Sequence, residues 1–104
     1  MPGKIVVTDL KPRPAIVERQ IKSGSGPMTP IIFENRTDMR VHLYWPDFKG
    51  ARTERGIVAP GTTRCDCTYA SHAWLVQHED GAFIGIYVAD HTVSRIVIRN
   101  ERKP

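Results

Sequence analysis

The chain has 104 residues, enough for one small domain with a single modest core. Apolar residues make up 40% and charged residues 25% of it, an ordinary balance for a soluble globular protein. The formal net charge of +4 comes from scattered lysines and arginines, and no apolar run reaches membrane-spanning length. Length and composition therefore exclude a second domain and a membrane segment, and they give only a weak signal for nucleic acid.

Residues 1–29 are expected to form an arm ahead of the compact domain. Residues 4–8 are a short β-branched run that could be an edge strand, whereas residues 15–22 fit a short helix or a strand equally well. The Gly- and Ser-rich residues 23–27 then form a flexible joint. The arm either packs on the domain or pairs with the sheet edge of another subunit.

From residue 30 onward the sequence predicts strand after strand. The predicted strands cover residues 31–33, 41–45, 51–58, 62–67, 71–78, 83–88 and 92–98. They recur about every ten residues, with turn signals between them and no long helical period, which indicates an all-β, antiparallel sandwich over residues 30–104. Glu79-Asp80-Gly81 predicts a hairpin, and the last two strands are expected to form a final antiparallel pair.

The two cysteines, Cys65 and Cys67, are separated by one residue. Neighbours at this spacing on a strand point the same way but are poorly placed for an unstrained disulfide. Two thiols also fall short of a zinc site unless His72 or His78 joins them. The chain opens without a secretory signal pattern. We therefore expect free thiols, no metal, no cofactor and a cytoplasmic location.

Catalysis is not favoured by the residue pattern. Ser71 adjoins His72, but adjacent strand residues face opposite sides, so this pair is badly placed for nucleophilic catalysis. Cys67 is better placed relative to His72, yet nothing resembles an oxyanion-hole loop or a nucleophile elbow. We expect a protein that is not an enzyme.

Nucleic-acid binding is a further alternative. Four aromatic residues near several arginines could stack the bases of a single strand, namely Tyr44, Trp45, Phe48 and Trp74. The competing interpretation places most of these aromatics in the core and leaves the arginines on a solvated face. We favour this second interpretation, so nucleic acid is not an expected partner.

Residues 68–74 form the chemically richest stretch of the chain. Thr68, His72 and Trp74 supply a hydroxyl, an imidazole and an indole. In an extended chain from Ser71 onward, His72 and Trp74 point to one face and the residues between and after them to the other. Such a group suits holding a ligand. The alternative is that Trp74 belongs to the core and that His72 merely borders it.

Several short motifs lie in register over roughly residues 30–100. They are Ile31-Ile32-Phe33-x-Asn35-Arg36, Val41-x-Leu43-x-Trp45-x-x-Phe48-x-Gly50, Pro60-Gly61-Thr62 and Tyr69-x-x-His72-x-Trp74-Leu75. Together they resemble the β domain of the von Hippel–Lindau tumour suppressor family. The resemblance implies a seven-stranded, prealbumin-like sandwich. It also implies a module that binds a peptide as an extra strand and recognises a hydroxylated proline.

The resemblance also implies roles for particular residues. Trp45 and Trp74 would be the two indole walls around the hydroxyproline ring. Thr68 falls where the family has a serine, and His72 falls on the histidine that contacts the ligand hydroxyl. Aromatic faces suit a pyrrolidine ring, and a buried hydroxyl needs both a donor and an acceptor. A site with such paired groups rejects unmodified proline, because the groups would be left unpaired.

Two positions depart from the family pattern. Arg55 replaces the pocket tyrosine, and Cys67 replaces a second histidine that holds the peptide backbone, so we keep both as ligand-binding candidates at the margin of the site. The family's helical α domain, which recruits the elongin partner and hence the ubiquitin ligase, has no counterpart before Pro104. We therefore expect a peptide- or protein-binding module that recognises an extended segment with proline or hydroxyproline, and not a complete ubiquitin ligase adaptor.

The alternative function is structural. In that interpretation the arm pairs with another subunit to form a homo-oligomer, and the pocket residues serve only packing.

Overall fold

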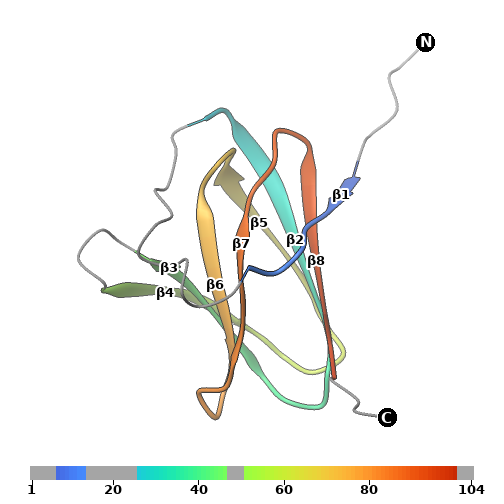
Figure 1. Ribbon diagram of the computed structural model, residues 1–104. Helices are drawn as coiled ribbons and strands as arrows, with labels where there is room; N and C mark the ends of the chain where they lie inside the picture. Colours follow the sequence, from blue (N-terminus) through green and yellow to red (C-terminus); the bar gives the residue numbers. More distant parts are fainter. Residues whose placement is uncertain (1–6, 14–25, 47–50, 101–104) are drawn as a thin grey trace.

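The computed structural model describes residues 7–13, 26–46 and 51–100. In these residues it shows two four-stranded sheets packed as a sandwich (Figure 1), and it shows no helix there that is long and apolar enough to cross a membrane. The strands are β1 (Val7–Asp9), β2 (Met28–Arg36), β3 (Val41–Pro46), β4 (Arg52–Val58), β5 (Thr63–Tyr69), β6 (Ala73–His78), β7 (Phe83–Val88) and β8 (Val93–Arg99). The expected all-β sandwich is confirmed, and its eighth strand, β1, comes from the N-terminal arm.

The strand pairing confirms one expectation and corrects another. The first sheet has the order β1-β8-β2-β5 and the second the order β4-β3-β6-β7. Glu79-Asp80-Gly81 joins the antiparallel strands β6 and β7, and Gly81 there has a φ of 90°. The expected antiparallel pair of β7 and β8 is wrong, because β8 lies in the other sheet, parallel to β1 and β2. The sandwich is therefore mixed rather than wholly antiparallel.

Backbone hydrogen bonds hold the chain beside β6 where it leaves β7. Ala89, directly after β7, is buried, and its backbone bonds to the turn between β5 and β6. Ser71 N donates to Ala89 O at 2.8 Å, and Ala89 N donates to His72 O at 3.0 Å. These bonds hold the chain beside β6, so it does not reverse as a tight hairpin. Strand alternation contains no signal for the crossing from β7 to β8, because it reports only which residues face a core.

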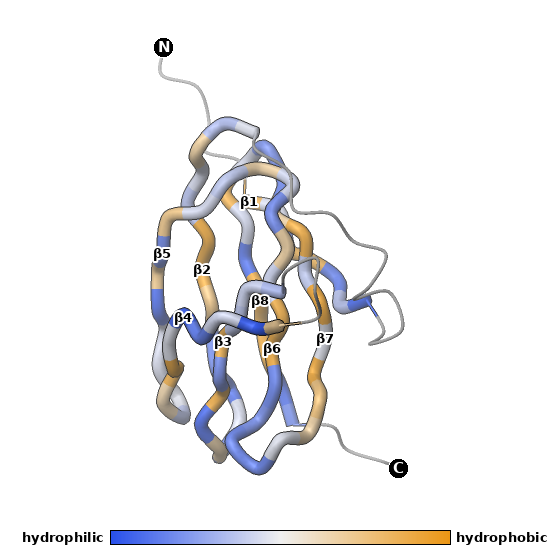
Figure 2. The backbone as a smooth tube through the Cα atoms, turned by 90° about the vertical axis from the view of Figure 1, so that its left-hand side faces the viewer, coloured by the Kyte–Doolittle hydropathy of each residue, from blue (hydrophilic) through white to orange (hydrophobic). Residues whose placement is uncertain are grey.

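The core lies between the two sheets and follows the alternation of strand residues. Its buried members are Ile31, Phe33, Val41, Leu43, Val58, Trp74, Val76, Tyr87, Ile96 and Ile98. As expected, Trp45 shares the inward face of β3 with the buried Val41 and Leu43. Figure 2 shows hydrophobic segments along β2 and mostly hydrophilic colour along β4 and β5. The side of the sandwich at β4 and β5 is therefore its polar side.

A buried asparagine fixes the connection between β2 and β3. Asn35 is only 1% exposed, and its Nδ2 donates to Met39 O at 2.8 Å and to Val58 O at 2.9 Å. Its Oδ1 accepts from Thr37 N at 3.0 Å and from Thr37 Oγ1 at 2.7 Å. One side chain therefore closes the turn after β2 and ties that turn to the end of β4.

The described part of the arm lies against its own domain. In Figure 1, β1 runs beside β8, and Leu10 N donates to Arg95 O at 2.8 Å. Arg13 then exchanges two backbone hydrogen bonds with Ile86 of β7, at 2.8 and 3.0 Å. Residues 7–13 thus run from the edge of one sheet to the edge of the other. The segment 15–22, for which helix and strand were equally expected, lies outside the described residues.

The arm depends on a close approach to Gly85. A Cβ atom built on Gly85 would lie 2.4 Å from Cβ of Pro12, too close for the arm to stay in place. We expect Gly85→Ala to displace residues 10–13 and to abolish the protection of the Arg13 amide in hydrogen exchange. The amide of Phe33, in the central strand β2 of the other sheet, serves as the internal control and should stay protected. An unchanged Arg13 amide would contradict the expectation.

Candidate functional site

Three of the predicted rings converge at one end of the second sheet. Trp45 lies near the end of β3, Trp74 lies in β6, and His72 lies in the turn before β6. The centroids of Trp45 and His72 are 4.4 Å apart at an interplanar angle of 68°, and those of Trp45 and Trp74 are 5.6 Å apart at 82°. Both are edge-to-face contacts, an arrangement that aromatic rings favour. Trp45 and His72 are half-buried, so this cluster reaches the surface.

The turn before β6 positions His72. The sequence predicted that this strand begins at Ser71, but β6 begins at Ala73. The reason is that Ser71 has a φ of 70°, which is not an extended conformation. His72 N donates to Tyr69 O at 3.0 Å, and the bonds to Ala89 hold the other side of the turn. His72 and Trp74 still contact the same ring, that of Trp45. A non-glycine residue in the left-handed region is uncommon and is kept where the surrounding structure enforces it.

Trp74 and Thr68 form the buried floor of the cluster. Each is only 1% exposed, and Trp74 Nε1 donates to Thr68 Oγ1 at 2.9 Å. The indole also packs against Phe33, with ring centroids 5.1 Å apart. Because the threonine oxygen accepts this bond, its own hydroxyl proton remains available to a further acceptor. Trp74 is therefore mainly a core residue, and Trp45 supplies the more accessible wall.

Arg55 joins this cluster, whereas Cys67 does not. The guanidinium carbon of Arg55 lies 4.0 Å from the centroid of the Trp45 ring, a cation–π contact. On β5, Thr68 faces the interior, so alternation places its neighbour Cys67 on the outer surface, where the thiol is exposed. Cys67 also faces away from His72, the partner considered for nucleophilic catalysis. The structure thus brings together Trp45, Arg55, Thr68, His72 and Trp74, and leaves Cys67 on the opposite face of β5.

An ion pair beside this cluster was missed in the sequence. Arg64 and Asp66 share the inner face of β5 with Thr68, and Arg64 Nε donates to Asp66 Oδ2 at 2.7 Å. The hydrogen bond and the negative charge of Asp66 raise the pKa of Arg64. The sequence did contain a signal for this ion pair, namely polar residues at positions 64, 66 and 68 of one strand face. A face that packs only on the core would have apolar residues at all three positions.

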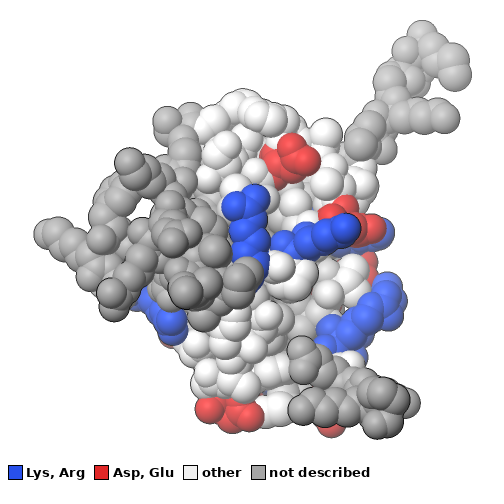
Figure 3. Space-filling view, in the orientation of Figure 1, with Lys and Arg blue, Asp and Glu red and all other residues white. Residues whose placement is uncertain are grey.

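Neither the distribution of charged side chains nor the grouping of metal-binding residues indicates a second site in the described part of the chain. Figure 3 shows basic and acidic side chains interspersed over the visible face, without a continuous basic patch among the described atoms. In residues 7–13, 26–46 and 51–100, no three His, Cys, Asp or Glu side chains gather as a metal site would require.

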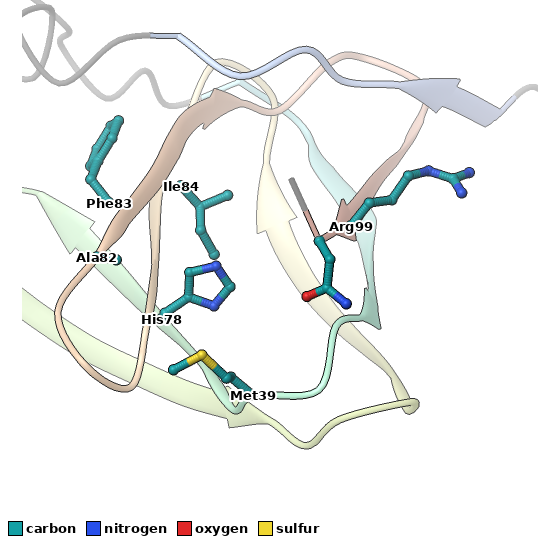
Figure 4. Close-up of a pocket in the computed structure, with 7 residues that line it drawn as sticks. Met39, His78, Ala82, Phe83, Ile84 and Arg99 are labelled. Carbon is teal, nitrogen blue, oxygen red and sulfur yellow. The ribbon is translucent and has the colours of Figure 1, made fainter. Parts of the chain in front are cut away.

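A cavity of about 310 Å³ lies at the other end of the sandwich. Its lining residues are Met39, His78, Ala82, Phe83, Ile84, Arg99 and Asn100. Figure 4 shows the imidazole of His78 between Ile84 and Met39. Nδ1 of His78 is buried and has no hydrogen-bond partner among the described residues. None of the six residues predicted from the sequence lines this cavity.

The fold and the cluster define a class of protein: an all-β sandwich with an aromatic and polar cluster that reaches its surface. The profile of the VHL beta domain matches residues 21–90, more than half of the chain. The chain belongs to the VHL beta domain family. This family is a non-catalytic binding module, and in VHL the domain binds hydroxyproline peptides. No curated protein matches the chain.

Proposed function

We propose that this domain binds an extended peptide segment that contains proline or hydroxyproline. The proposal rests on one observation, the convergence of Trp45, His72 and Trp74 above the buried hydroxyl of Thr68. The half-buried Trp45 ring offers apolar surface for a pyrrolidine ring beside the Arg55 guanidinium, which lies over one face of the indole. Strand β4 supports the extended form of the ligand, because it lies at the edge of its sheet, where a peptide can add as a further strand.

The hydrogen-bonding inventory supports hydroxyproline over proline. Thr68 already accepts from Trp74, so its hydroxyl donates to the oxygen of the ligand hydroxyl. A neutral His72 then accepts the proton of the same hydroxyl through one ring nitrogen. Unmodified proline would leave both groups without this partner, at a cost of about 1–3 kcal/mol. That difference corresponds to about a 5- to 150-fold preference in affinity.

The test compares two peptides that differ only in proline or 4-hydroxyproline at a central position. We expect the hydroxylated peptide to bind the wild-type chain more tightly by calorimetry, because only it offers a hydroxyl group to Thr68 and His72. His72→Ala should remove most of that preference. His91→Ala is the matched control, because His91 is exposed and lies in the connection between β7 and β8.

Two outcomes would refute this function. One is that neither peptide binds the wild-type chain. The other is that His72→Ala and His91→Ala leave the same preference for the hydroxylated peptide.

The structural alternative is supported by the burial of Trp74, whose indole N–H is satisfied within the chain. In that case the cluster serves packing and the chain assembles through its arm. Sedimentation of the chain with and without the arm separates the two functions: a concentration-dependent oligomer that is lost when residues 1–26 are removed would favour assembly through the arm.

A further inference from the structure

We propose that Arg55 makes this site selective for an acidic prolyl segment, one with an aspartate or glutamate directly beside the prolyl residue. The inference rests on the proposed function and adds the charge of the ligand to it.

A β-bulge brings Arg55 to the site. In the pair of β3 and β4, Trp45 lies opposite Thr53, and Leu43 lies opposite Gly56. The register shifts between these pairs, so Arg55 is the extra residue on β4. Residues opposite each other in a pair share a face, which places Arg55 and Gly56 together on the inward side. The bulge thus turns a charged side chain of an exposed edge strand over the Trp45 ring, 4.0 Å from its centroid.

The bulge is held from the neighbouring sheet. A bulge leaves a backbone group without a partner in the ladder, and here Arg64 Nη2 donates to the carbonyl oxygen of Arg55 at 3.2 Å. Gly56 makes this contact possible, because a Cβ atom there would lie 2.4 Å from Nη1 of Arg64. The backbone of Arg55 is therefore anchored, and its guanidinium lies over the Trp45 ring.

The charge of Arg55 is not neutralised within the described chain. Its neighbour Glu54 lies on the other face of β4, where its Oε1 is 3.5 Å from Nδ1 of His42. The nearest carboxylate on the inner face of β5, that of Asp66, is engaged by Arg64. No ion pair of Arg55 occurs among the residues that the structure describes, and its side chain contacts the Trp45 ring instead.

A ligand on Trp45 must therefore come close to an exposed guanidinium that forms no ion pair with residues 7–13, 26–46 or 51–100. Because the guanidinium lies over one face of that indole, a prolyl ring packed against the rest of the indole places the adjacent residue of an extended peptide beside Arg55. A carboxylate there forms a charge-assisted hydrogen bond with the fork of the guanidinium. An uncharged neighbour leaves the cation without a partner as the ligand excludes water. The partner that this chemistry recognises is thus an acidic peptide segment, and the residue that distinguishes it is Arg55.

The test uses hydroxyproline peptides in which aspartate or asparagine precedes or follows the hydroxyproline. We expect the wild-type chain to prefer aspartate on at least one side by about 2- to 5-fold, within the range of exposed charge pairs. Arg55→Gln should abolish this charge preference but keep the preference for hydroxyproline over proline. Arg99→Gln is the matched control, since Arg99 is an exposed arginine at the end of β8 and should keep both preferences.

The outcomes separate this inference from the proposed function. Equal affinities for the aspartate and asparagine peptides, or a charge preference that survives Arg55→Gln, would overturn the inference alone. A failure of every hydroxyproline peptide to bind would overturn both. A charge preference that shrinks with added salt in wild type and is absent in Arg55→Gln would support it further.

Discussion

Replacing Trp74 with alanine is expected to lower the free energy of unfolding by about 3–5 kcal/mol. Trp74 is 1% exposed and packs against Phe33, so its removal leaves a large cavity between the sheets. The change also removes the donor of the hydrogen bond that the buried Thr68 Oγ1 accepts from the indole N–H. Urea denaturation monitored by far-ultraviolet circular dichroism measures the loss.

Two further variants test the reason for this loss. Trp74→Phe keeps an aromatic ring and removes the hydrogen bond, so it should cost less than Trp74→Ala. Trp45→Ala should also cost less, because Trp45 is half-buried and packs only at the margin of the core. A loss for Trp74→Ala no larger than that for Trp45→Ala would show that the indole of Trp74 is not part of the core.

Asn35→Leu is expected to destabilise the domain by about 3–5 kcal/mol, because single mutations reach such values when they break a buried polar network. The leucine removes two donors, to Met39 O and Val58 O, and one acceptor, for Thr37. These groups lie at a turn where water cannot replace every bond. The stability of the variant is measured by the same denaturation.

The control for Asn35 is Asn100→Leu, because Asn100 is exposed beyond the end of β8. That variant should change the free energy of unfolding by less than about 0.5 kcal/mol, as surface substitutions usually do. Equal effects of the two asparagine variants would mean that the network around Asn35 is not what closes the turn after β2.

Much of the local structure could be predicted from the sequence. Val41, Leu43 and Trp45 show their shared face through the two-residue period of a strand, and Glu79-Asp80-Gly81 shows its hairpin through turn chemistry. The spacing of several short motifs was enough to indicate the VHL beta domain, which the profile match over residues 21–90 confirms. These signals are local, so each can be read without knowing where the rest of the chain lies.

The site was only partly predictable for the same reason. The sequence placed Trp45, Thr68, His72 and Trp74 in one motif framework, and the structure brings their side chains together. The spacing of residues in the sequence could not show that Cys67 faces outward. Which face of β5 points inward depends on how β5 pairs with β2.

The sequence by itself thus determined the strands, most of their turns and the family. The tertiary structure decided the partners: the parallel place of β8 beside β2, the burial of Trp74, and the bulge that carries Arg55 over Trp45. Alternation and turn signals describe a few consecutive residues. Strand partners and bulges arise instead from contacts between residues apart in the chain, such as the hydrogen bonds of Ser71 N to Ala89 O and of Arg64 Nη2 to Arg55 O.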